Sequence, residues 1–171
     1  MTLPSTATTD LSDAYPEAQV CEPGLTSYGG LRAFFGQVHT IKVFEDNALV
    51  RSTLETPGAG RVLVVDGGGS RRCALLGGNL AKLGVANGWA GVVVYGCIRD
   101  SREIAGYDLG VMALGTHPRK SEKGLHSGAS GRDVAFAGVT FRTGAWLYAD
   151  EDGVVVADRA LHVTGLTDGD R

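Results

Sequence analysis

Two stretches decide the fold: RVLVVDGGGS at residues 61–70 and GVVVYGCIRD at residues 91–100. Each contains a continuous apolar run bounded by turn-forming residues, which predicts strands over 61–66 and 92–95 that are buried on both faces. Between them, apolar residues recur at helical spacing and predict a helix over 75–87. Strand, helix and strand form a βαβ unit, whose two parallel strands end at the same edge of one sheet.

The rest of the chain extends this unit into one α/β domain. With 171 residues, the chain can bury one sizeable core but is short for two domains. The sequence predicts short helices at 9–15 and 45–54, and strands at 38–44, 111–114, 134–141, 146–149 and 154–156. We expect a disordered N-terminus over 1–8, a domain over 9–160 and a solvated C-terminal tail over 161–171.

Composition and charge exclude several classes of protein. The formal net charge of -3 provides no basic excess, so direct binding of DNA or RNA is not expected. No stretch approaches the ~20 apolar residues of a membrane span, and the opening residues lack a signal pattern, so we expect a cytoplasmic protein without membrane contact. Three cysteines without a CxxC pair suit a reducing compartment. The 26 glycines predict tight turns or close approach of the backbone to a ligand.

Two loops should meet at the carboxyl edge of the predicted sheet, where ligands bind in open α/β folds. The first is DGGGS at 66–70, and the segment GGNL at 77–80 follows it near the start of the predicted helix. Backbone N–H groups in such segments suit a carboxylate. The second loop is 96–100, so both loops should contact one small molecule.

The second loop carries the two side chains best suited to chemistry. Arg99 offers a planar fork of donors that can hold a 2-oxo carboxylate. Asp100 offers hard oxygen for Mg²⁺ or Mn²⁺, which keep several waters and need few protein ligands. Zinc is not favoured because the four histidines have no recognisable zinc spacing.

Each of these signals also has a purely structural interpretation. An Arg–Asp pair after a strand can be a helix cap with a surface ion pair, and glycines after a strand can serve only a tight turn. The charged loop 118–123 is interpreted as a solvated face. Cys97 is interpreted as a packed residue, because no histidine is placed by the sequence to activate it as a nucleophile.

Several segments resemble the family of regulator of ribonuclease activity A and the class II 4-hydroxy-4-methyl-2-oxoglutarate aldolases. In order between about residues 10 and 156, they are DGGGSRRCALLGGNLAKL, NGWAGVVVYGCIRD, LGTHPRKS, GVTF and LYADEDGVVV. The resemblance implies an α/β/α sandwich of the swivelling β/β/α type, assembled as a homotrimer or a hexamer with its cleft near a subunit boundary. It also implies backbone contacts to substrate from Gly77, Gly78, Asn79 and Leu80, substrate binding by Arg99 and metal binding by Asp100.

The resemblance implies one of two functions. The first is divalent-metal-dependent cleavage of 4-hydroxy-4-methyl-2-oxoglutarate, or a related 4-hydroxy-2-oxo acid, to pyruvate, with oxaloacetate decarboxylation through the same pyruvate enolate. The alternative is a regulator that binds and inhibits an RNA-degrading ribonuclease without catalysis. Regulator-type sequences have Gln after the Arg of this motif, whereas this chain has Asp100, which favours the enzyme.

Two departures from the family leave the proton-transfer group open. Some members have an acidic residue within the segment that matches 77–80, and some have a C-terminal extension, both of which are missing from this sequence.

A methyltransferase is a third interpretation, because VLVVDGGGS resembles a strand and glycine loop that cradle S-adenosylmethionine. The chain is short for that fold.

Overall fold

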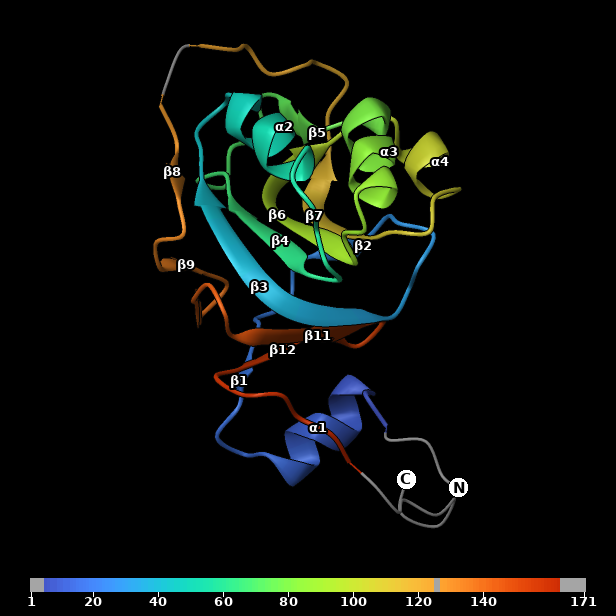
Figure 1. Cartoon of the computed structure of the whole chain (residues 1–171), viewed down its shortest axis with the longest axis vertical. Helices are drawn as coiled ribbons and strands as arrows, with labels where there is room; N and C mark the ends of the chain where they lie inside the picture. The colour runs from blue at the N-terminus through green and yellow to red at the C-terminus, as the bar shows by residue number, and fades with distance from the viewer. Residues whose placement is uncertain (1–4, 125–126, 164–171) are drawn as a thin grey trace.

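The centre of the fold is a run of parallel strands in the order β3-β4-β6-β7 (Figure 1). These strands are β3 (Phe34–Lys42), β4 (Val62–Asp66), β6 (Gly91–Ile98) and β7 (Gly110–Thr116). The computed structural model describes residues 5–124 and 127–163. All five residues of β4 are buried, as expected for a strand covered on both faces. The parallel pairing of β4 with β6 confirms the predicted βαβ unit.

Further strands extend this run on both sides. The remaining elements are α1 (Thr8–Ala14), β1 (Gln19–Val20), β2 (Thr26–Ser27), α2 (Ala48–Leu54), β5 (Ala74–Leu76), α3 (Gly78–Ala86), α4 (Ser101–Ile104), β8 (Ala129–Ser130), β9 (Val134–Phe136), β10 (Val139–Phe141), β11 (Trp146–Asp150) and β12 (Gly153–Ala157). The first half of β3 pairs with β11, and its second half pairs with β4. The strand β3 therefore joins the parallel strands to the antiparallel layer of β11 and β12.

The two faces of the parallel strands are covered differently (Figure 1). Helices α2, α3 and α4 pack on one face, where a core cluster joins side chains such as Leu63 and Val92 to helix residues such as Leu54. The other face packs against β9, β10, β11 and β12 through a second cluster that includes Val64 and Phe141. The molecule is a mixed α/β single domain with helices on one side of the sheet and β-structure on the other.

Several predicted elements differ from the structure in their bounds. The predicted helix 75–87 begins only at Gly78, because Ala74–Leu76 instead forms β5, a buried strand paired with the end of β6. The predicted strand 134–141 is a hairpin, β9 and β10, whose turn residues Ala137 and Gly138 both have positive φ. No helix within the described residues is both long and apolar enough to cross a membrane.

The prediction that residues 1–8 are disordered is wrong where they are described. Ser5 forms a β-bridge with Val163, and α1 begins at Thr8, one residue before the predicted start. Leu161, the first residue of the expected tail, is also packed, because its side chain is buried and its backbone bonds to the Tyr148 hydroxyl. Residues 1–4 and 164–171 lie outside the described residues.

Asp150 fixes α1 to the sheet, and its loss should destabilise the fold. Its carboxylate accepts hydrogen bonds from the Thr8 backbone N–H (2.8 Å) and hydroxyl (2.6 Å). Burial alone would raise the pKa of Asp150, but the hydrogen bonds from Thr8, Asp152 and Gly153 outweigh burial and lower that pKa below 3.8. We expect Asp150→Ala to lower the free energy of unfolding by about 1–2 kcal/mol at pH 7.

The pH dependence of this effect follows from the sign of the shift. A carboxyl group whose pKa is lowered by folding stabilises the fold above its unfolded pKa, and the stabilisation disappears as the pH falls through the folded value. The difference between wild type and Asp150→Ala in urea unfolding should therefore shrink on going from pH 7 to pH 3. A difference that is independent of pH would contradict this assignment.

Candidate active site

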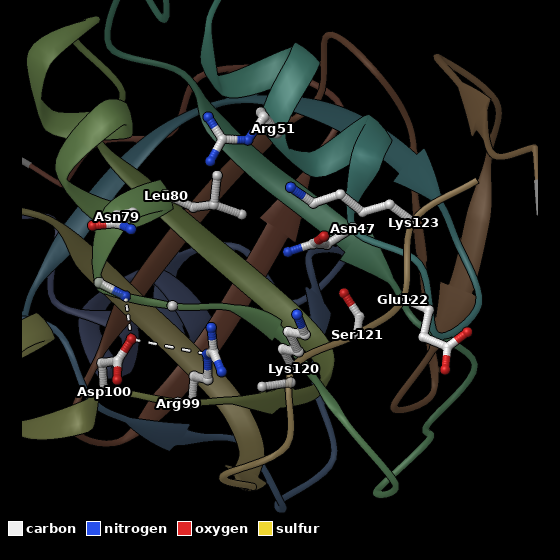
Figure 2. A pocket seen from close by; sticks show the side chains of 13 residues that line it. Asn47, Arg51, Asn79, Leu80, Arg99, Asp100, Lys120, Ser121, Glu122 and Lys123 are labelled. Carbon is white, nitrogen blue, oxygen red and sulfur yellow. Dashed lines mark hydrogen bonds and ion pairs between the residues drawn. The ribbon is translucent and has the colours of Figure 1, made fainter. Parts of the chain in front are cut away.

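A cavity of about 600 Å³ opens where the ends of β5 and β6 meet helices α2 and α3 and the segment 120–123 (Figure 2). Its lining residues are Asn47, Arg51, Ala74, Gly77, Gly78, Asn79, Leu80, Arg99, Asp100, Lys120, Ser121, Glu122 and Lys123. All the residues that the sequence singled out in 77–80 and at 99–100 therefore line one cavity. The structure brings them together because β5 and β6 run side by side and in parallel.

Arg99 and Asp100 directly follow β6, and local backbone geometry positions both. The Arg99 N–H donates to the Leu76 carbonyl at 2.9 Å, which holds the start of the loop against β5. Asp100 has φ 56 and ψ 39, in the left-handed region that Asp and Asn tolerate better than most residues. This conformation lets Asp100 Oδ2 accept the Gly78 N–H at 2.9 Å, while Arg99 Nε lies 4.0 Å from the same oxygen.

The segment 77–80 forms the start of α3. Gly77 precedes the helix, and the N–H groups of Asn79 and Leu80 in its first turn have no acceptor one turn back in the helix. Both residues line the cavity. A side chain at Gly77 would crowd the site, since a Cβ there would lie 3.0 Å from Asp100 Oδ2 and 3.4 Å from Arg99 Nε.

We expect Gly77→Ala to impair the site without unfolding the protein. The backbone of Gly77 has φ -123 and ψ -174, which alanine adopts readily, so only the added methyl group matters. Displacing Asp100 and Arg99 by a few tenths of an ångström should weaken the binding of a small carboxylate in the cavity by roughly tenfold. Calorimetric titration with pyruvate, with thermal unfolding as a control, would measure this, and an unchanged affinity would contradict the placement of these two side chains.

Three cations that sequence reasoning missed also line the cavity. Arg51 comes from α2. Lys120 and Lys123 come from the loop 118–123, which the sequence pattern predicts to be a solvated face. The exposed side chains of Lys120, Glu122 and Lys123 agree with that interpretation, but Ser121 is buried and backbone contacts hold the segment beside the cavity. The Ala74 N–H donates to the Arg119 carbonyl at 2.8 Å, and bridges join residues 74 to 120 and 46 to 122.

The DGGGS loop at 66–70 does not line this cavity, contrary to expectation. It borders a separate shallow hollow with Phe44. The amides of Gly67 and Gly69 donate to the Tyr95 carbonyl, and that of Gly68 donates to the Asp66 side chain. The loops are apart because β6 continues beyond Tyr95 to Ile98, so Arg99 lies about 13 Å further along the strand direction.

Two kinds of candidate group remain, the Cys97 thiol and the side chains that could bind a metal ion. Cys97 is buried, and burial raises the pKa of its thiol, which agrees with the interpretation as a packed residue. Among the residues that the structure describes, no three His, Cys, Asp or Glu side chains gather as a metal-binding group. Of the two carboxylates that line the cavity, Asp100 and Glu122, Asp100 is half exposed and lies beside Arg99.

Comparison with known proteins identifies the class to which this fold and site belong. The RraA-like family model, described as Aldolase/RraA, matches residues 8–156. A protein of Alkalilimnicola ehrlichii named "Putative 4-hydroxy-4-methyl-2-oxoglutarate aldolase" is 59% identical over 160 residues, covering 92% of this chain and 98% of that protein. The chain belongs to the RraA-like family.

Two solved structures are similar in sequence and fold. One, from Geobacillus kaustophilus, is titled S-adenosylmethionine:2-dimethylmenaquinone methyltransferase; it is 54% identical with a TM-score of 0.87, covering 90% of this chain and 96% of that one. The other is titled the RNA-processing inhibitor RraA from Thermus thermophilis; it is 47% identical with a TM-score of 0.88, covering 94% and 96%. The names of the relatives thus describe three different activities.

Proposed function

We propose that this protein is a divalent-metal-dependent aldolase that cleaves 4-hydroxy-4-methyl-2-oxoglutarate, or a related 4-hydroxy-2-oxo acid, to pyruvate. The observation that carries the proposal is the pairing of Arg99 with Asp100 at one end of a cavity that the first turn of α3 also lines. An anion-binding fork and a hard carboxylate oxygen side by side suit a chelating 2-oxo acid and a cation. The names of close relatives support the same reaction.

The residues present fit a hydrated Mg²⁺ or Mn²⁺. Both polar contacts of the Asp100 carboxylate within the described chain go to Oδ2, so Oδ1 keeps its lone pairs for a cation or its water. About half of the side chain is exposed, which leaves room for the several waters that Mg²⁺ retains. Asp100 would hold the cation, which when bound supplies a fixed positive charge that polarises the substrate carbonyl.

The other groups of the site bind and orient the substrate. The Arg99 guanidinium donates to the substrate carboxylate, and the Asn79 and Leu80 amides donate to oxygens at the same end of the molecule. As the C3–C4 bond breaks, the C4 hydroxyl gives up its proton and becomes the carbonyl of the second product, while the electron pair of the bond leaves negative charge on the C2 oxygen of the pyruvate enolate. A proton added at C3 then completes pyruvate. Donors held rigidly by α3 and by the loop after β6 stabilise that charge without reorganising, which lowers the barrier.

Oxaloacetate decarboxylation is a second reaction that the same groups would support. Loss of CO₂ from oxaloacetate leaves the same pyruvate enolate as aldol cleavage, so Arg99 and the α3 amides stabilise the same developing charge. We therefore propose that the protein decarboxylates oxaloacetate as a side activity.

The experiment that tests the proposal is an assay of pyruvate release. The substrates are 4-hydroxy-4-methyl-2-oxoglutarate and oxaloacetate, each with Mg²⁺, with Mn²⁺ and with a chelator. We expect turnover that depends on the cation. Rates that are no higher than without protein, under all conditions, would refute the aldolase.

A ribonuclease regulator is the second candidate, favoured by the similarity to the RNA-processing inhibitor of Thermus thermophilis. That function would use the protein surface rather than the cavity, so it predicts partner binding that ignores cations and pyruvate. A methyltransferase is disfavoured because the amides of Gly67 and Gly69 donate to the Tyr95 carbonyl of β6, and that of Gly68 to the Asp66 side chain, rather than to a ligand. Thermal shifts with S-adenosylmethionine, or with Mg²⁺ and pyruvate, separate these possibilities.

A further inference from the structure

A second carboxylate lies against the start of α3, beside the residue that Asp100 contacts. Glu103 belongs to α4, three residues after Asp100. A Cβ at Gly78 would overlap the Glu103 carboxylate, so that carboxylate occupies the space that a side chain at position 78 would take. The N–H of the same glycine donates to Asp100 Oδ2 at 2.9 Å (Figure 2). The carboxylates of Asp100 and Glu103 therefore lie against one buried glycine.

Tyr107 holds the Glu103 carboxylate in this place. The Tyr107 hydroxyl donates to Glu103 Oε1 at 2.6 Å. Tyr107 is itself fixed, because its side chain packs against the core cluster on the helix face of the sheet and its carbonyl accepts the Gly30 N–H at 3.0 Å. The hydrogen bond to Glu103 raises the pKa of Tyr107 most, followed by burial and by the charges of Glu103 and Asp100. The three groups thus form one cluster beside the cavity.

The balance of charge around Asp100 gives this second carboxylate a role. Arg99 Nε lies 4.0 Å from Asp100 Oδ2, so the charges of these two side chains largely cancel for an approaching cation. Glu103 is hydrogen-bonded to a neutral hydroxyl, which leaves its negative charge in place. The partial positive charge at the start of α3 allows two carboxylates to lie there together. With Glu103, the three ionised side chains carry a net negative charge that attracts a divalent cation.

We propose that Glu103 is a positioning residue for the divalent cation at Asp100. Its negative charge, fixed beside Gly78 by Tyr107, raises the affinity of Asp100 for Mg²⁺ or Mn²⁺. Glu103 is not among the residues that line the cavity, so it acts through Asp100 and the cation rather than on the substrate. The inference rests on the proposed function only in placing a divalent cation at Asp100.

The test is a titration with Mn²⁺ in the absence of substrate, in which electron paramagnetic resonance measures the free ion. Glu103→Gln keeps the size of the side chain and an oxygen for the Tyr107 hydroxyl but removes the charge. We expect the dissociation constant for Mn²⁺ to rise by about tenfold, the order expected when one charge near a divalent cation is lost in a solvated site. Tyr107→Phe, which keeps Glu103 but releases it, should raise the constant by about two- to threefold. An unchanged affinity in Glu103→Gln would overturn the proposal.

Asp108→Asn is the matched control for the loss of charge. Asp108 is an exposed carboxylate shortly after α4 that neither lines the cavity nor lies against Gly78. We expect its Mn²⁺ affinity to stay within about twofold of wild type, because exposed charges further from the cation are screened by solvent and salt. An equal loss of affinity in Asp108→Asn and Glu103→Gln would reflect net charge alone and would overturn the assignment to Glu103.

Moving the carboxylate to α3 tests whether its place is what matters. Glu103→Ala empties the space beside Gly78 and should weaken Mn²⁺ binding by about tenfold. Gly78 is not among the residues with positive φ, so an aspartate can occupy its backbone conformation. The double variant Glu103→Ala with Gly78→Asp should therefore return to within about threefold of the wild-type affinity. A double variant that is folded by thermal unfolding, yet binds Mn²⁺ no better than Glu103→Ala, would overturn the proposal.

These titrations can be separated from the test of the aldolase itself. If Asp100→Asn and Glu103→Gln both weaken Mn²⁺ binding but no pyruvate is released by the wild type, the aldolase fails and the role of Glu103 stands. If pyruvate is released and only Asp100→Asn weakens Mn²⁺ binding, the aldolase stands and the role of Glu103 fails.

Discussion

Asp100→Asn is expected to abolish cation-dependent pyruvate release, lowering kcat/KM by about a hundredfold or more. A fixed cation that stabilises developing charge contributes several kcal/mol, and each ~1.4 kcal/mol is a factor of ten in rate. Asparagine keeps the shape of aspartate and tolerates the left-handed backbone at this position, with φ 56. Its side-chain oxygen can still accept the Gly78 N–H, so the fold should survive.

The measurement is pyruvate release by wild type and Asp100→Asn across a titration with Mg²⁺ and Mn²⁺. Asp108→Asn is the matched control, since it removes an exposed carboxylate nearby that does not line the cavity. Circular dichroism and thermal unfolding show whether the variant is folded. Equal rates for wild type and Asp100→Asn, without dependence on the cation, would defeat the aldolase and favour the ribonuclease regulator.

Arg99→Lys is expected to lower kcat/KM by about ten- to a hundredfold while changing Mn²⁺ affinity little. Lysine keeps the positive charge but cannot reproduce two parallel hydrogen bonds to a carboxylate, and a lost charge-assisted hydrogen bond costs ~1.5–3 kcal/mol. The cation should be spared because Arg99 Nε lies 4.0 Å from Asp100 Oδ2, and both side chains are well exposed to solvent.

Kinetics of pyruvate release, together with a direct Mn²⁺ titration, would check this prediction. Arg102→Lys provides a control, because Arg102 is an exposed arginine of α4 outside the cavity. Wild-type kcat/KM in Arg99→Lys would show that Arg99 does not hold the substrate as a fork. Loss of Mn²⁺ binding would instead show that Arg99 maintains the position of Asp100.

The sequence by itself determined the parallel core and one end of the site. Continuous apolar runs form β4 and β6 because strands covered on both faces need apolar side chains at every position. The chemistry of Arg99 and Asp100 is carried by residues adjacent in sequence, and their place after a strand puts them at the carboxyl edge of the sheet. Those features depend on residues that are close together in the sequence, which is why they could be predicted.

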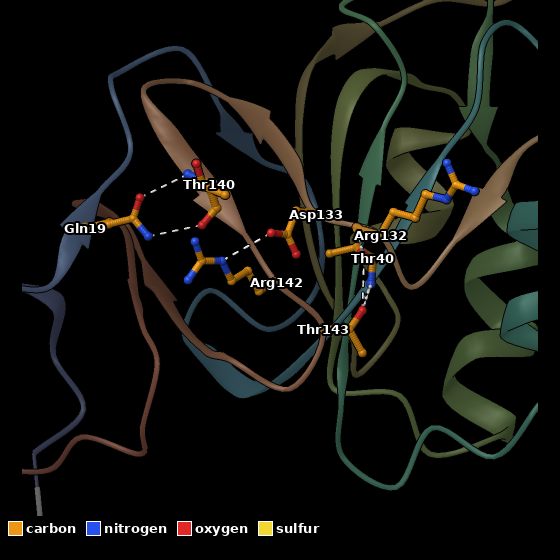
Figure 3. A network of polar contacts seen from close by, with 7 residues as sticks. All are labelled: Gln19, Thr40, Arg132, Asp133, Thr140, Arg142 and Thr143. Carbon is orange, nitrogen blue, oxygen red and sulfur yellow. Dashed lines mark hydrogen bonds and ion pairs between the residues drawn. The ribbon is translucent and has the colours of Figure 1, made fainter.

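Local pattern was least reliable where two structures suited the same residues. Leu75 and Leu76 match the helical spacing of α3, yet they belong to β5. Beyond the end of β4, the edge of β6 has backbone groups left to pair, and β5 pairs with them. The hairpin of β9 and β10 was likewise predicted as one strand. Its place depends on contacts far apart in sequence, such as those of Gln19 with the Thr140 backbone at 3.0 and 3.1 Å (Figure 3).

Only the tertiary structure decided that Lys120 and Lys123 line the cavity. Residues 120–123 have the composition of a solvated loop, but the Arg119 carbonyl accepts the Ala74 N–H and a bridge joins Asp46 to Glu122, which places Lys120 and Lys123 on the cavity wall. These contacts are made by backbone groups, which nearly every residue possesses. Because these contacts do not depend on side-chain type, no sequence pattern predicts them. The two lysines could therefore be assigned to the cavity only from the three-dimensional structure.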